Sequence, residues 1–334
     1  MRSDHDLPWT IWSERPIPDG LRHLLEPDAR STGPWELPGE DPLRGIEGAD
    51  GTIASARMRY DGAVFERAAR LRVVARTGVG VDNVAVDEAT RRGVAVCNVP
   101  GGPTISTAEH AITLMLAAAK RLKSAVAALA AGSWDTFNEH QAVELAGMTL
   151  GVVGLGKIGR RVARVALALD MRVLAWDPHL DDEDIREAGV QPASSLDELL
   201  AASQVVSLHA PLTEETRGLL DRRRIGLLPH GAVLVNTSRG GLINEEALLE
   251  ALDSGRLGAV GLDVFEHEPL ASGSPLVGRA DVVATPHLAA GTVQGRERLW
   301  RAAIEDVMSC LRGEVPRGIV NPGVLETEVT EEEL

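Results

Sequence analysis

The chain has 334 residues, 44% of them hydrophobic, and it carries 34 lysine and arginine residues against 49 aspartate and glutamate residues. This length exceeds what one ordinary core accommodates, and it predicts two domains with a cleft between them. The formal net charge of −15 argues against nucleic acid and anionic lipid as partners, because both are themselves negatively charged.

The lengths of the apolar runs and the number of cysteines indicate in which cellular compartment the protein resides. The longest strongly apolar stretch, residues 111–119, is far shorter than a bilayer span, and residues 1–9 lack the apolar core of a signal peptide. Cys97 and Cys310 give neither a disulfide framework nor the spacing of metal ligands. We therefore expect a soluble cytoplasmic protein with no membrane, nucleic-acid or metal partner, whose acidic tail at 326–334 favours solubility.

A parallel βαβ lobe is predicted from about Gly51 onward, because short β-rich runs alternate there with helix-like segments. The predicted strands are 52–55, 71–75 and 94–98, and the predicted helices are 64–70 and 86–92. Proline and glycine at 100–103 end this lobe, and we expect a domain hinge there. A long helix follows, with Ser106 and Glu109 at the spacing of a capping box. The first 50 residues, with Trp9, Trp12 and Trp35, give no indication of function.

A second lobe begins after Gly147, where the alternation restarts. Six strands are predicted near 149–153, 172–176, 205–209, 232–236, 259–263 and 281–284, which indicates a doubly wound sheet. An amphipathic segment at 294–311 follows the last strand, and we expect it to return to the first lobe. The expected fold class is α/β with two doubly wound parallel-sheet lobes. The first domain comprises residues 1–102 and 290–334, and the second comprises residues 103–289.

Three glycines at dinucleotide-binding spacing follow the first strand of the second lobe: Gly154, Gly156 and Gly159. Glycine allows the tight turn, the close approach of a pyrophosphate and the packing of the following helix on the sheet. The spacing alone is weak evidence in a chain with 34 glycines, but here it follows a strand and opens a helix. Asp177 ends the next strand, where a carboxylate binds the adenosine ribose and repels a 2′-phosphate. We therefore expect NAD rather than NADP.

Arg239, Glu268 and His287 each follow a predicted strand of the second lobe. The carboxyl ends of parallel strands share one edge of the sheet, so these three side chains can converge on a small substrate. Reduction of a 2-oxo acid needs a proton donor near neutral pH, which suits His287. A carboxylate at Glu268 favours the imidazolium, and Arg239 can bind the substrate carboxylate. Taken singly, each also fits an ordinary role, as a turn histidine, a surface acid and a helix-capping arginine.

Several strings resemble the D-2-hydroxyacid dehydrogenase family, and the resemblance runs from about Gly51 to Asn321. They are Gly154-Leu-Gly-Lys-Ile-Gly159, Asn236-Thr-Ser-Arg-Gly240, Asp263-Val-Phe-Glu-His-Glu-Pro269, Thr285-Pro-His-Leu288, Arg76-Thr-Gly-Val-Gly-Val-Asp-Asn83 and Ser106-Thr-Ala-Glu-His110. The resemblance implies a Rossmann NAD-binding domain inserted in a flavodoxin-like substrate-binding domain, and an NAD-dependent enzyme that moves a hydride between the nicotinamide and a small 2-hydroxy or 2-oxo acid.

The same resemblance implies roles for particular residues. Arg239, Glu268 and His287 are then the catalytic set, and the backbone N–H groups of Val79 and Gly80 help Arg239 to hold the substrate carboxylate. It further implies a homodimer with the interdomain helix in the contact. The implied cofactor-binding residues are Gly154, Gly156, Lys157, Ile158, Gly159, Asp177, His209, Pro211, Thr237 and Asp263.

Two departures from the family pattern concern the substrate. Phosphoglycerate-oxidising relatives often carry an arginine where this chain has Ser55, although Arg57 and Arg59 follow closely; the loop at 101–104 also differs from the usual one. We therefore expect a small, unphosphorylated acid. Two alternatives remain open: a formate- or phosphite-oxidising enzyme on the same scaffold, and a co-regulator that senses dinucleotides.

Overall fold

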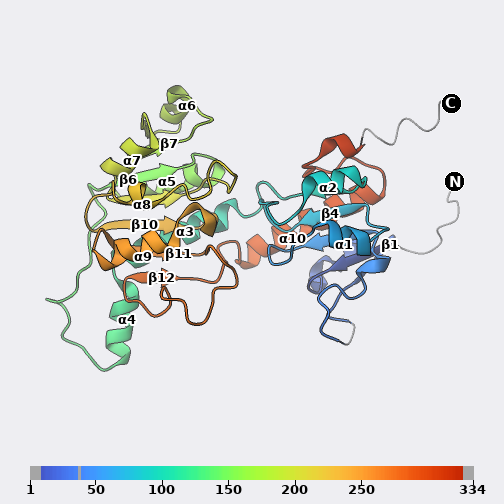
Figure 1. Cartoon of the computed structure of the whole chain (residues 1–334), viewed down its shortest axis with the longest axis horizontal. Coiled ribbons are helices and arrows are strands. Elements are labelled where there is room, and N and C mark those ends of the chain that lie inside the picture. Colours follow the sequence, from blue (N-terminus) through green and yellow to red (C-terminus); the bar gives the residue numbers. More distant parts are fainter. Residues whose placement is uncertain (1–8, 37–38, 326–334) are drawn as a thin grey trace. The chain divides into compact units, whose positions relative to one another are not determined.

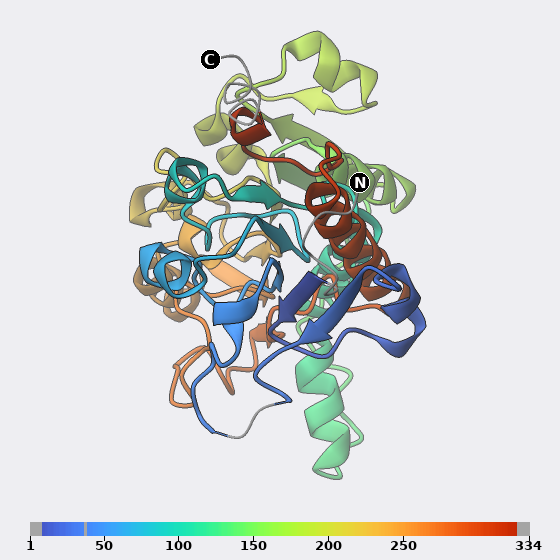
Figure 2. The same cartoon turned by 90° about the vertical axis from the view of Figure 1, so that its right-hand side faces the viewer.

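The computed structural model describes residues 9–36 and 39–325, so the acidic tail discussed above lies outside the described residues. The chain forms two compact units. Unit 1 comprises Met1–Pro103 and Thr292–Leu334, and unit 2 is the continuous segment Thr104–Gly291. Figures 1 and 2 show this interruption, since the blue beginning and the red end of the chain belong to the same unit.

Unit 1 is built on a five-stranded parallel sheet. Its strands are β1 (Trp9–Ser13), β2 (Ala29–Thr32), β3 (Gly51–Ala54), β4 (Val73–Arg76) and β5 (Ala95–Cys97). Their order in the sheet is β2-β1-β3-β4-β5, which is the flavodoxin-like order. Residues of β3, β4 and β5 are buried throughout, as expected for strands covered on both faces.

The helices of unit 1 cover this sheet, and one of them comes from the C-terminal part of the chain. They are α1 (Gly62–Arg67), α2 (Val86–Arg91) and α10 (Val293–Leu311), with short 3-10 helices η1 (Asp19–Leu24), η2 (Ile46–Gly48) and η4 (Pro322–Leu325). Helix α10 packs on β3, β4 and β5, so the amphipathic segment does belong to the first lobe. Asn321 secures the end, because its side chain accepts from the Val96 N–H and donates to the Val94 carbonyl.

The first 50 residues contribute more than the sequence indicated. Strand β1 is the second strand of the sheet and pairs with both β2 and β3. Trp12, in β1, is fully buried, and its indole N–H donates to the Arg44 carbonyl over 2.8 Å. The parallel sheet of unit 1 therefore begins at Trp9 rather than near Gly51.

Unit 2 holds a seven-stranded parallel sheet. Its strands are β6 (Thr149–Val153), β7 (Arg172–Trp176), β8 (Gln191–Pro192), β9 (Val205–Leu208), β10 (Ala232–Asn236), β11 (Leu257–Leu262) and β12 (Val282–Ala284). The order is β12-β11-β10-β9-β6-β7-β8, so the strand order reverses at β6 and β9. This is the Rossmann order with one further strand, and ligands of such sheets bind at the reversal point.

Two helices of unit 2 precede β6 in the sequence, and the others lie between its strands. Together they are α3 (Thr104–Ala119), α4 (Leu122–Ala130), α5 (Lys157–Ala168), α6 (Asp182–Glu187), α7 (Leu196–Ala202), α8 (Arg222–Ile225), α9 (Glu245–Asp253) and the 3-10 helix η3 (Gly240–Leu242). Helix α3 packs on α5, β10 and β11. Among the described residues, no helix has the length and hydrophobicity needed to cross a bilayer.

Two expectations for unit 2 are wrong. The sheet has a seventh strand, β8, which is only two residues long and includes Pro192; a proline is tolerated there because β8 is an edge strand. Ser106 does not cap the long helix either. Helix α3 begins at Thr104, directly after Pro103, so Ser106 lies within its first turn and is buried.

Candidate active site

The glycine turn after β6 has the geometry that the fingerprint predicts. Gly154 has φ +90°, and a Cβ there would lie 2.8 Å from the carbonyl carbon of His209. A Cβ at Gly159 would lie 2.2 Å from the Gly154 oxygen, so this glycine lets helix α5 pack against the turn. A Cβ at Gly156 would meet no described atom within 4 Å. Two glycines are thus required by the fold, and the third leaves open space at the N-terminus of α5, where a pyrophosphate binds in such folds.

Asp177 lies at the carboxyl end of β7 and is tied to the same turn. One of its oxygens accepts from the Leu155 N–H over 2.9 Å, and the other accepts from the His179 N–H over 3.0 Å. The side chain is half-buried. The residue predicted to bind the ribose therefore also braces the glycine turn.

Two buried polar atoms at neighbouring strand ends lack a hydrogen-bond partner among the described residues. They are Nδ1 of His209, after β9, and Oγ1 of Thr237, after β10. The other ring nitrogen of His209 lies 2.9 Å from the Ser207 hydroxyl, and burial lowers the pKa of His209 to about 4, so the ring is neutral at physiological pH. Unsatisfied buried polar atoms are rare, and here they fit a polar ligand at the carboxyl edge of the sheet.

The remaining residues predicted to bind the cofactor lie around this edge. Lys157 and Ile158 begin helix α5, the first exposed and the second half-buried. Pro211 is exposed, and its carbonyl accepts from the Thr216 hydroxyl over 2.7 Å. Together with the glycine turn and the two unpartnered atoms, these positions fit a dinucleotide laid across the reversal point between β6 and β9.

Glu268 and His287 form a direct pair. Oε2 of Glu268 lies 2.6 Å from Nδ1 of His287, and Oε1 accepts from the Phe265 N–H over 3.1 Å. An ionised carboxylate can only accept, so Nδ1 of His287 carries the proton in this pair and Nε2 is left to exchange protons with a ligand. About one third of each side chain is exposed, 32% for His287 and 34% for Glu268. The pair is therefore both oriented and accessible.

Arg239 lies on the loop after β10, and a close backbone contact brings this loop against the one that leads to Glu268. A Cβ at Gly240 would lie 1.8 Å from the carbonyl carbon of Phe265, so only glycine permits the approach. The Arg239 side chain is half-buried and donates to the Ser238 carbonyl over 2.8 Å, while its own carbonyl accepts from Asn236 over 2.9 Å. The strand-end argument thus correctly places Arg239 on the same sheet edge as the histidine pair.

Asp263 supports the turn that carries His287. It is fully buried at the end of β11, and its carboxylate accepts from the N–H groups of Leu288 over 2.9 Å and Ala289 over 2.8 Å. Its carbonyl accepts from the His287 N–H over 2.8 Å. Burial alone would raise the pKa of Asp263, but the nearby His110 ring and the hydrogen bonds from Thr285, Leu288 and Ala289 lower it below its usual range. Asp263 is therefore an ionised anchor beneath the histidine turn.

Sequence reasoning missed His110 as a partner of this anchor. His110 lies on α3, 3.4 Å from the Asp263 carboxylate and 2.9 Å from the Thr285 hydroxyl. All three residues occur in the strings that resemble the family. No local spacing connects positions this far apart in the sequence, so only the packing of α3 on β11 reveals the contact.

Unit 1 contains the loop predicted to bind the substrate carboxylate, directly after β4. The Val79 carbonyl accepts from Asn98 over 2.7 Å, and the Gly80 carbonyl accepts from the buried Arg76 side chain over 3.0 Å. Within the described part of the chain, the N–H groups of Val79 and Gly80 donate to no other residue. Hydrogen bonds therefore fix the carbonyl groups of Val79 and Gly80, while their two N–H groups can bind an anion.

Ser55, at the end of β3, is bound to a carboxylate. Its N–H donates to Glu14 over 2.8 Å, its hydroxyl donates to the same carboxylate, and Tyr60 donates to it over 3.1 Å. Arg57 and Arg59 are exposed on the following loop. The position at which the sequence raises the question of a phosphate-binding cation thus presents a serine hydrogen-bonded to an acid.

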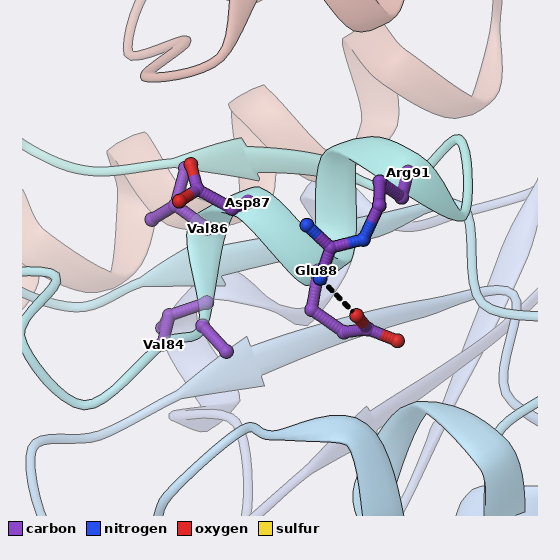
Figure 3. Close-up of a pocket in the computed structure, with 6 residues that line it drawn as sticks. Val84, Val86, Asp87, Glu88 and Arg91 are labelled. Atoms are coloured by element: carbon purple, nitrogen blue, oxygen red, sulfur yellow. Dashed lines mark hydrogen bonds and ion pairs between the residues drawn. The ribbon is translucent and has the colours of Figure 1, made fainter.

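Unit 1 also has a hollow away from these residues. It has a volume of about 270 Å³ and is lined by Val84, Ala85, Val86, Asp87, Glu88 and Arg91. Figure 3 shows the Arg91 side chain paired with Glu88, one turn away on the same helix. None of the predicted site residues lines this hollow. Among the described residues, no cluster of three histidine, cysteine, aspartate or glutamate side chains could hold a metal ion.

Comparison with known proteins identifies the family. Residues 112–289 match the model of the D-isomer specific 2-hydroxyacid dehydrogenase, NAD binding domain. The chain belongs to this family. Residues 112–289 therefore form its NAD-binding domain, which confirms both the cofactor and the fold expected from the glycine turn.

Relatives within the family carry several names. A D-3-phosphoglycerate dehydrogenase of Archaeoglobus fulgidus is 39% identical over 84% of this chain and 53% of that protein. A glyoxylate reductase of Korarchaeum cryptofilum is 38% identical over 84% of this chain and 85% of that protein. The structure of D-lactate dehydrogenase from Aquifex aeolicus, complexed with NAD and lactic acid, has a TM-score of 0.82 at 29% identity, covering 93% of this chain and 98% of that chain. The chain spans about half the length of the phosphoglycerate dehydrogenases it matches.

Proposed function

We propose that this chain is an NAD-dependent oxidoreductase that transfers a hydride between the nicotinamide and a small 2-hydroxy or 2-oxo acid. The observation that carries the proposal is the 2.6 Å pair of Glu268 and His287 at the carboxyl edge of the sheet in the NAD-binding domain. A paired, partly exposed histidine is the group that proton transfer to a reduced carbonyl requires. A protein that only senses a dinucleotide has no need of such a pair.

The proposed chemistry divides among three side chains. Bound NADH supplies the hydride to the carbonyl carbon of the acid. His287 donates a proton from Nε2 to the carbonyl oxygen, and Glu268 stabilises the imidazolium and fixes the ring through Nδ1. Arg239 binds the substrate carboxylate, for which its planar pair of donors is suited. In the direction of oxidation, His287 accepts the hydroxyl proton instead.

The N–H groups of Val79 and Gly80 are proposed as further donors to a substrate carboxylate. Both are available, as described above, and successive backbone N–H groups form an anion-binding nest. The proposal extends to the substrate class. Because Ser55 is neutral and bound to Glu14, we expect an acid without phosphate, such as glyoxylate, pyruvate or hydroxypyruvate, to be preferred.

A substrate screen tests this function. NADH oxidation is measured with glyoxylate, pyruvate, hydroxypyruvate and hydroxypyruvate 3-phosphate, and the values of kcat/KM are compared. We expect the unphosphorylated acids to be reduced, with the best of them exceeding the phosphorylated acid by about tenfold or more. A tenfold preference for the phosphorylated acid that Arg57→Ala or Arg59→Ala erases would show that one of these arginines binds phosphate. Reduction of NAD by formate or phosphite with no turnover of the 2-oxo acids, or nucleotide-dependent association without any turnover, would instead establish one of the two alternatives.

We further propose that the chain forms a homodimer through helix α4 and the segment after it. Helix α4 has no buried residue, and Leu122, Val126 and Leu129 lie more than half exposed on one stripe of it. Trp134 and Phe137, in the following segment, are 86% and 89% exposed. Figure 1 shows α4 and this segment projecting from the rest of unit 2. Contiguous apolar surface of this kind is rare on monomers and marks an interface.

The dimer is tested by sedimentation equilibrium of the full chain. Val126→Glu, which places a charge on the exposed stripe of α4, is expected to weaken self-association by about tenfold or more, because a buried unpaired charge is strongly unfavourable at an interface. Val315→Glu is the matched control, since Val315 is 73% exposed in unit 1 and lies outside the proposed surface. A wild-type chain that sediments as a monomer, or equal association of the two variants, would contradict the proposal.

A further inference from the structure

His287 lies in an unusual backbone conformation that its surroundings must maintain. Its φ is +50°, in the left-handed region that residues with a side chain rarely adopt. Asp263 holds both sides of this position, accepting from the His287 N–H through its carbonyl and from the Leu288 and Ala289 N–H groups through its carboxylate. The conformation therefore depends on where the Asp263 carboxylate is held.

His110 and Thr285 hold that carboxylate from the other side. The Thr285 hydroxyl donates to Oδ1 of Asp263 over 2.6 Å. A hydroxyl has one proton, so Thr285 can only accept from its second neighbour, Nε2 of His110 at 2.9 Å. Nε2 of His110 must therefore carry a proton, and the hydrogen bonds run in one direction, from His110 through Thr285 to Asp263.

This chain of hydrogen bonds joins helix α3 to the histidine turn. His110 lies on α3. Its neighbours on this helix, Ala108, Ala111 and Leu114, are buried in the core of unit 2 and fix its position. Its side chain is 17% exposed, and Asp263 is 0% exposed, so the interaction is shielded from water. A shielded, charge-assisted network is stronger and more rigid than an exposed one.

We propose that His110 is a positioning residue for the reaction: its Nε2–H, acting through Thr285 and Asp263, keeps the turn 285–289 in the conformation that presents His287 for proton transfer. The inference rests on the proposed function, because it assigns His287 the proton. His110 contacts neither His287 nor Glu268 in the interactions described above, and it acts only through the anchor.

The test compares His110→Ala with His110→Gln in the full chain, using the best 2-oxo acid of the screen. His110→Ala is expected to lower kcat by about tenfold with the Kd for NADH within about twofold, because small misplacements of a catalytic group reduce turnover without removing the cofactor site. The solvent deuterium isotope effect on kcat should increase, since proton donation by a poorly held His287 becomes more rate-limiting. His110→Gln retains an N–H donor and is expected to recover most of the activity.

A second measurement does not depend on turnover. Hydrogen exchange of the segment 285–291 should be faster in His110→Ala than in the wild type, because the Leu288 and Ala289 N–H groups lose a fixed acceptor. His230→Ala is the matched control: His230 is exposed, and it precedes the amino end of β10, opposite the edge that carries the site. It should change neither exchange in this segment nor kcat.

Each outcome decides the inference. An unchanged kcat in His110→Ala would overturn the inference. A lower kcat with an unchanged isotope effect and unchanged hydrogen exchange of residues 285–291 would also overturn it, because this combination reflects only a smaller folded fraction. A wild type that reduces none of the acids would refute the proposed function instead. In that case, faster exchange in His110→Ala would still support the positioning of the turn, and equal exchange would refute it.

Discussion

Replacing His287 with alanine is expected to lower kcat for 2-oxo acid reduction by about 100-fold or more, while the Kd for NADH stays within about twofold. The imidazole of His287 is the group proposed to carry the proton. Among the interactions of the described residues, His287 is the only base that Glu268 contacts. The glycine turn and Asp177, which are expected to bind the cofactor, belong to other strand ends and are unchanged by the substitution. Stopped-flow titration measures the Kd for NADH, and steady-state kinetics measure kcat.

His230→Ala again serves as the control for removal of a histidine ring from unit 2. A His287→Ala variant that keeps more than about a third of wild-type kcat would show that another group supplies the proton. If the variant instead loses NADH binding in parallel with kcat, His287 belongs to the cofactor site and the division of roles proposed here is wrong.

The second large effect concerns Arg239. Arg239→Ala should lower kcat/KM for the 2-oxo acid by about 100-fold or more, equivalent to about 3 kcal/mol, since a charge-assisted pair of hydrogen bonds to the substrate carboxylate is lost. Arg239→Lys keeps the charge without the planar pair of donors, and it should recover only part of this loss. Saturation curves for the acid at a fixed NADH concentration give kcat/KM for both variants.

The expected pattern for Arg239 differs from that for His287. Loss of Arg239 should raise KM for the acid strongly, whereas loss of His287 should act chiefly on kcat. A KM for the acid that is unchanged in Arg239→Ala would exclude the arginine from carboxylate binding. Circular dichroism of both variants establishes that the differences arise in a folded protein.

Prediction of the fold succeeded where strands are long and flanked by breakers. The bounds of β6, β7 and β10 agree with the predicted ranges, because each is a run of about five β-prone residues between polar or glycine-containing turns. Strand β8 has two residues and so has no periodicity to detect. Strands β1 and β2 lie among tryptophans and prolines without a regular alternation, and their place in the sheet depends on pairing with β3.

The candidate site could be predicted as far as strand topology reaches. Parallel strands bring the ends of β10, β11 and β12 to one edge, and this placed Arg239 and His287 together with Glu268 before any contact was known. The support beneath them was not predictable. The partnership of His110 with Asp263 depends on how α3 packs on the sheet, and the left-handed φ of His287 depends on hydrogen bonds within the folded turn.

The left-handed backbone of His287 also bears on how this protein can be engineered or can evolve. A residue with a side chain held at φ +50° costs about 1 kcal/mol or more relative to glycine, which adopts this region freely. Thermal stability alone would therefore favour glycine at position 287, although that substitution removes the proposed proton donor. Directed evolution that selects only for heat resistance should drift toward inactive chains at this turn. A search for hardier variants must therefore keep position 287 constant or select for turnover at the same time.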